Sequence, residues 1–130
     1  MKNGIAYSAI TVTACTVLAV PAFAHHSYAM FDREKMVTVT GAVTNFEWAA
    51  PHIYVWVKVP NATGGSDVWG MEGGSPTSLV HNGWSKKSLA TGDKVTVDLR
   101  PLKDGRNGGY LVKITKADGS VVGDTSSLKE

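Results

Sequence analysis

The sequence predicts an all-β domain with one short helix. Three observations lead to this prediction. β-branched and aromatic residues fill the segment 36–48, strict alternation of apolar and other residues runs through 52–59, and further alternating runs follow between turns rich in glycine and proline. With 130 residues, the chain has room for a leader segment and a single domain.

The first two expected strands lie at 36–48 and 52–59. Gly41 interrupts the first strand, and we expect a bulge or bend there. In the second strand, "PHIYVWVKV", side chains point alternately to opposite faces. One face carries His52, Tyr54 and Trp56 and is expected to meet solvent or a ligand. The core face carries Ile53, Val55, Val57 and Val59.

A helix is expected to interrupt the later strands. Ser75 can cap it, Pro76 suits its first turn, and Gly83 supplies a stop signal. The remaining expected elements are a strand at 67–72, the helix at 76–82, and strands at 94–100 and 110–115.

Three strands, a short helix and two more strands follow the order of the OB-fold, a five-stranded barrel. A small antiparallel sandwich is the alternative, but it ordinarily needs about seven strands. We therefore predict a five-stranded OB-like antiparallel barrel at 36–123, preceded by an N-terminal arm at 25–35 and followed by a polar tail at 124–130.

The first 24 residues have the pattern of a secretory signal peptide. Lys2 precedes an apolar run over 5–20, and "PAFA" ends at Ala24 with small residues at the positions that signal peptidase reads. A retained transmembrane anchor would need about 20 apolar residues without an early proline. A lipoprotein signal at Cys15 would leave the apolar "TVLAVPAFA" behind the lipid. We expect cleavage after Ala24 and a periplasmic or secreted protein.

The composition after such a cleavage narrows the chemistry. Cys15 lies in the leader, so the remaining 106 residues contain no cysteine, which excludes disulfides and thiolate metal sites. The formal charge falls to +1, and no basic patch predicts a nucleic-acid partner. No transmembrane segment is expected after cleavage, and no recognised catalytic motif is present, so we do not expect an enzyme.

The histidines suggest a metal site. Cleavage after Ala24 would make His25 the first residue, whose amine and ring Nδ1 can chelate one ion together, and imidazole suits copper, nickel and zinc. This terminus resembles that of periplasmic copper chaperones and copper monooxygenases, although the match is confined to position 25. The candidate ligands are His25, His26 and His52, with Met30, Asp32 and Glu72 as secondary candidates. The alternative is that these side chains are simply solvated or hydrogen-bonded.

The outward face of the second strand suggests a different kind of partner. Tyr54 and Trp56 share that face, and OB-folds bind ligands there by aromatic stacking. An envelope glycan, small molecule or protein would fit. The alternative is that the rings are covered by the helix or by the N-terminal arm, and a purely structural role without any ligand also stays open.

Four blocks carry a resemblance to a known family: "HHSYAMFD", "GAVTNFEWAAPHIYVWV", "VWGMEGGSPTSLVHNGW" and "LATGDKVTV". Together they resemble the DUF6152 family of small exported bacterial proteins. The resemblance implies an exported single β domain. It implies no activity and no catalytic residues, because the family has none established.

Overall fold

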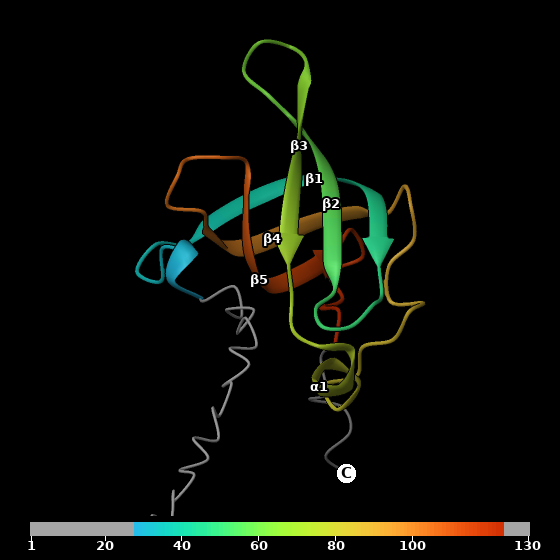
Figure 1. Cartoon of the computed structure of the whole chain (residues 1–130). Helices are drawn as coiled ribbons and strands as arrows, with labels where there is room; N and C mark the ends of the chain where they lie inside the picture. Colours follow the sequence, from blue (N-terminus) through green and yellow to red (C-terminus); the bar gives the residue numbers. More distant parts are fainter. Residues whose placement is uncertain (1–27, 124–130) are drawn as a thin grey trace, which may run out of the picture.

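The computed structural model describes residues 28–123, which form a closed five-stranded barrel (Figure 1). The predicted all-β OB-like barrel with one short helix is confirmed. The proposed leader at 1–24, His25, His26 and the tail at 124–130 lie outside the described residues. The elements are η1 (Tyr28–Met30), β1 (Val37–Glu47), β2 (Tyr54–Pro60), β3 (Ser66–Glu72), α1 (Pro76–Val80), β4 (Lys94–Pro101) and β5 (Gly108–Lys116).

The strands follow one another around the barrel in the order β1-β2-β3-β5-β4, and β4 pairs again with β1. Four of the five neighbouring pairs are antiparallel, as expected. The exception is β3 with β5, which run parallel over three register pairs. The helical crossover after β3 brings β4 beside β1, and β5 then returns antiparallel to β4, so it meets β3 in the same direction.

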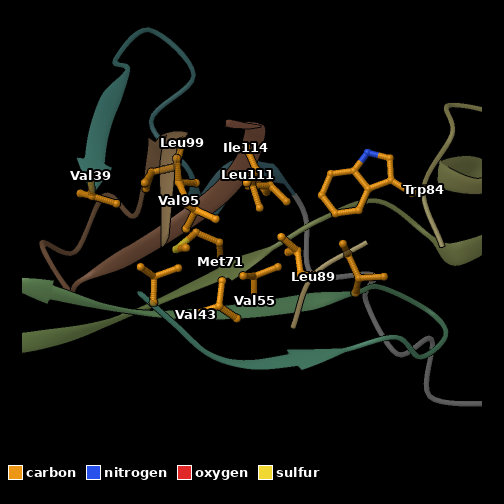
Figure 2. Packing of buried hydrophobic residues seen from close by; sticks show 13 residues of the cluster. Val39, Val43, Val55, Met71, Trp84, Leu89, Val95, Leu99, Leu111 and Ile114 are labelled. Carbon is orange, nitrogen blue, oxygen red and sulfur yellow. The ribbon is translucent and has the colours of Figure 1, made fainter. Parts of the chain in front are cut away.

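The barrel interior is filled by the predicted face of β2 and by matching faces of the other strands. Ile53, Val55 and Val57 are fully buried, whereas Val59 is only partly so. Met71 of β3 lies in the middle of the core (Figure 2). Because the interior is taken up by these side chains, a ligand site has to lie on the outside or at an end of the barrel.

The bulge in β1 lies elsewhere than predicted. The register with β2 shifts between Val43 and Asn45, not at Gly41. A Cβ atom at Gly41 would instead lie against the carbonyl oxygen of Lys58 on β2. Gly41 is therefore needed for the close approach of two strands; the expectation there was a bulge or bend, and the bulge lies after Val43 instead.

Helix α1 begins where the sequence predicts and ends at Val80, two residues earlier than expected. The hydroxyl of Ser75 accepts a hydrogen bond from the Ser78 amide at 3.2 Å and caps the helix. Gly83 has a φ of 77° and turns the chain so that Trp84 enters the core (Figure 2). Within residues 28–123, no helix combines the length and apolar character needed to cross a membrane.

The described part of the N-terminal arm is attached to the barrel. Phe31 is only 4% exposed and forms a β-bridge with Leu102. The Asp32 amide donates to the Pro101 carbonyl at 2.8 Å. Figure 1 shows η1 beside the loop that joins β4 to β5. The described chain therefore begins beside this loop.

Candidate functional site

A row of polar and aromatic residues crosses the outside of the barrel from strand to strand. We call it the polar row; each member is the register partner of the next. Its members are, in order, Glu47 of β1, Tyr54 of β2, Glu72 of β3, Tyr110 of β5 and Arg100 of β4. The register across four strand pairs therefore gathers residues that are up to 63 positions apart in the sequence.

His52 lies just before β2 and faces the polar row. Its Nδ1 is 3.2 Å from the carbonyl oxygen of Gly73. A carbonyl can only accept, so this contact requires a proton on Nδ1 and leaves Nε2 as the coordinating nitrogen of a neutral ring. Nε2 is 3.7 Å from Oε1 of Glu72. The structure thus brings together two residues that the sequence offered as separate candidate ligands.

The second oxygen of Glu72 has a different neighbour. The Tyr54 hydroxyl donates a hydrogen bond to Oε2 at 3.2 Å. Burial raises the pKa of Tyr54, and the negative charges of Glu72 and Glu47 and the hydrogen bond to Glu72 raise it further. Tyr54 therefore stays protonated and keeps the Glu72 side chain in place.

Tyr28 and Tyr110 connect the N-terminal arm to the polar row. Their rings pack edge to face with centroids 5.1 Å apart, and the Tyr28 hydroxyl donates to that of Tyr110 at 3.4 Å. Burial, together with the contact with Tyr28 and the charge of Glu72, raises the pKa of Tyr110 to about 12. The described chain thus begins at a residue that packs on Tyr110, the register partner of Glu72.

A cavity of about 200 Å³ opens beside the polar row. Glu72 and Tyr54 supply its polar wall on one side, and Arg106 from the β4–β5 loop supplies a cation. The other lining residues are apolar or lack a side chain: Met30, Phe31, Leu102, Gly70 and Gly109. The candidate secondary ligands Met30 and Glu72 therefore share one cavity.

The predicted aromatic face of β2 is present. The rings of Tyr54 and Trp56 stack with centroids 5.7 Å apart and planes 27° from parallel. The indole lies near Gly70, where a Cβ atom would be 3.3 Å from its nitrogen Nε1. Neither ring belongs to the barrel core. Both side chains are partly exposed on the outside of the barrel.

Not every candidate residue lies at this site. Asp32 pairs with Lys35, with Oδ2 3.2 Å from Nζ, and the hydrogen bond to Lys35 holds the pKa of Asp32 below its usual value. His81, the other histidine among residues 28–123, is the C-cap of α1 and also lies outside this site. Within residues 28–123, no three His, Cys, Asp or Glu side chains are grouped closely enough to hold a metal ion. His52 and Glu72 form a pair only.

Three residues of the site were missed by sequence reasoning: Tyr28, Tyr110 and Arg106. In the sequence, Tyr110 begins an expected strand, and Arg106 lies between the strands expected at 94–100 and 110–115. No local pattern distinguishes them, because their role depends on the parallel register of β3 with β5. A correct prediction of that pairing would have placed Tyr110 beside Glu72.

A known family model matches most of the chain, including the residues of this site. A family model described as "Family of unknown function (DUF6152)" matches residues 13–112. The chain belongs to the DUF6152 family. The matched range includes all members of the polar row, His52 and Arg106, and the segment with His25 and His26. No curated protein and no solved structure matches this DUF6152 member.

Proposed function

We propose that this protein is an exported metal-binding protein that holds a copper-type ion between His52, Glu72 and the N-terminal His25. In this proposal, the signal peptide is removed after Ala24 and the protein works in the periplasm or outside the cell. His26 and Met30 are further donors within the same short segment. The protein binds its ion and does not turn over a substrate.

The gap between His52 and Glu72 is the observation that carries the proposal. Nε2 and Oε1 are 3.7 Å apart, whereas a shared proton joins nitrogen and oxygen atoms at about 2.7 to 3.2 Å. Two ligand atoms that are each about 2.0 to 2.2 Å from one ion can be up to roughly 4.2 Å apart. The gap therefore suits a metal ion better than a proton.

The surroundings of the pair support the same interpretation. The Gly73 carbonyl fixes the tautomer of His52 that presents Nε2, which is the usual way in which an outer partner orients a metal-binding imidazole. The Tyr54 hydroxyl similarly holds Glu72. Among residues 28–123, no lysine or arginine lies within 4.0 Å of the Glu72 carboxylate. The Glu72 side chain is only 13% exposed, and its carboxylate would gain from a bound cation.

The missing ligands would come from the segment before Tyr28. His25 precedes Tyr28 by three residues, which can span about 10 Å of extended chain. Tyr28 packs on Tyr110, and Tyr110 is the register partner of Glu72. In this proposal the amine and imidazole of His25 reach the pair from Tyr28, and nitrogen ligands favour copper(II) among the divalent ions.

Titration calorimetry with copper(II) on protein that starts at His25 tests the proposal. We expect a single site tighter than about 1 μM, weakened at least about tenfold by His52→Ala or Glu72→Gln. His81→Ala is the matched control and should leave the affinity unchanged. Protein that starts at Pro21 keeps both N-terminal imidazoles but moves the free amine away from His25, and it should also bind more weakly. A site insensitive to His52→Ala, or none tighter than micromolar, refutes the proposal.

The stacked Tyr54–Trp56 pair supports a second candidate, an aromatic-face binding site for an envelope glycan or another ring-shaped ligand. Copper titration of Trp56→Ala distinguishes the metal site from the aromatic-face site. Among residues 28–123, Trp56 forms no hydrogen bond or ion pair with the proposed metal ligands His52 and Glu72. Unchanged copper affinity in Trp56→Ala leaves the aromatic face as a separate surface.

A further inference from the structure

We infer that the cavity beside the polar row binds a small zwitterion of the amino-acid class, with its ammonium group at Glu72 and its carboxylate at Arg106. This ligand is additional to the proposed metal ion and does not require it. The two would use different oxygens of Glu72: Oε1 faces His52, and Oε2 faces Tyr54, which lines the cavity.

The acidic side of the cavity is suited to an ammonium group. Oε2 of Glu72 already accepts one hydrogen bond from Tyr54, and a carboxylate oxygen can accept a second. The Tyr54 oxygen, which donates its own proton to Glu72, keeps lone pairs that can accept from the ligand. A primary ammonium has three N–H donors and could therefore use both acceptors at once.

The opposite charge comes from a different element. Arg106 lies in the loop between β4 and β5 and is held by Asp104, whose Oδ2 accepts from Nε at 2.8 Å. The terminal nitrogens of Arg106 have no hydrogen-bond or ion-pair partner among residues 28–123. A guanidinium with two terminal nitrogens available is suited to a carboxylate. Asp104 thus orients the guanidinium without occupying the part that would bind.

The size and the apolar wall limit the ligand. The cavity of about 200 Å³ has the volume of about seven water molecules in the liquid. Gly70 leaves the floor without a side chain, and Met30, Phe31 and Leu102 form an apolar wall. A small molecule with two opposite charges and a short apolar side chain, such as L-valine, satisfies all three features.

Calorimetry on chelator-treated protein that starts at His25 tests this inference, with L-valine as the probe. We expect measurable binding below about 10 mM L-valine, weakened at least about tenfold for valine amide, which lacks the carboxylate, and for N-acetylvaline, which lacks the ammonium. Arg106→Gln should weaken L-valine binding similarly, whereas Lys103→Gln, which alters a cation of the same loop outside the cavity, should not. Circular dichroism checks that each variant is folded.

The metal proposal and this inference fail separately. His52→Ala should weaken copper binding at least about tenfold and leave L-valine binding unchanged, while Arg106→Gln should weaken L-valine binding and leave the copper affinity unchanged. Absence of L-valine binding at about 10 mM overturns the inference whatever copper does. Equal binding of L-valine and both capped forms also overturns it, since the cavity would then recognise only the apolar side chain.

Discussion

Glu72 contacts both His52 and Tyr54, and it lies on the strand that joins β2 to β5. Its two oxygens face different partners, His52 on one side and Tyr54 on the other. Its backbone pairs with β2 on one side and with β5 on the other. A single carboxylate can therefore link the proposed metal site, a cavity and the parallel strand pair, and its removal should affect ligand binding more than folding, because it lies outside the hydrophobic core.

Residue-scale reasoning from the sequence succeeded where a residue's role depends on its immediate neighbours. The alternation of β2 correctly separated buried Val55 and Val57 from Tyr54 and Trp56. Sequence reasoning failed for Tyr110, because its position beside Glu72 results from the pairing of two residues 38 positions apart. Local patterns contain no information about such a pairing.

Asp98 provides a residue-scale prediction about pH. The Thr38 hydroxyl donates to its Oδ1 at 2.6 Å, and Lys113 Nζ lies 3.1 Å from Oδ2. These hydrogen bonds lower the pKa of Asp98, first through Thr38 and then through Lys113. A lowered native pKa stabilises the fold above the unfolded value of about 3.9, and the effect is lost as the pH falls through the native pKa.

We therefore expect Asp98→Asn to reduce the free energy of unfolding by about 0.5 to 1 kcal/mol at neutral pH. The difference from the wild type should shrink as the pH drops below about 4, where the wild-type carboxylate takes up its proton. Urea denaturation over a series of pH values measures this difference. Thr38→Val should lose part of the stability that the Asp98 carboxylate contributes. A stability difference between the wild type and Asp98→Asn that grows toward acid pH would contradict the lowered pKa of Asp98.

At the scale of elements, the helix and the strands were predicted within one or two residues of their observed ends. The two errors arose in β1 and α1. Glycine often marks a bulge or bend, which is what Gly41 predicts; the bulge itself follows Val43, and Gly41 allows the close approach to Lys58. The helix stops at Val80 because Gly83 and Trp84 turn the chain back onto Leu79.

The close approach of β1 and β2 provides an element-scale prediction. Gly41→Ala would place a methyl group against the Lys58 carbonyl and within 2.9 Å of a Val57 methyl group. Because neither the backbone nor the buried valine can move freely, we expect a loss of about 1 to 3 kcal/mol in the free energy of unfolding. Gly65→Ala is the control, since its nearest neighbour would be 3.5 Å away. Equal stability of the two variants in urea denaturation would show that the strands can separate without cost.

For the whole molecule, the described part of the N-terminal arm belongs to the folded unit. Phe31 is buried against the barrel, while Tyr28, three residues earlier, is 51% exposed. The backbone hydrogen bonds from Asp32 to Pro101 and from Lys103 to Met30 hold the segment between them. In the proposed function, this attachment fixes the position of Tyr28, and the N-terminal histidines would extend from that point.

Phe31→Ala should accordingly destabilise the protein by about 3 to 5 kcal/mol, the usual range for a buried phenylalanine. Tyr28→Ala should cost far less, because half of its surface is already in water. Thermal unfolding of both variants, monitored by circular dichroism, gives the comparison. Similar melting temperatures for Phe31→Ala and the wild type would mean that the arm contributes nothing to the fold.

Strand β1 closes the barrel from both sides, since its last residues pair with β2 and its first residues pair with β4. Val37 thereby finds its partner in Leu99, late in the chain. Pairings of such long sequence separation slow folding, because the intervening chain must be ordered before any contact is gained. The barrel therefore cannot close until almost all of the domain is available. In the proposed function the protein is exported, and this late closure would leave the chain unfolded until its last strands are available.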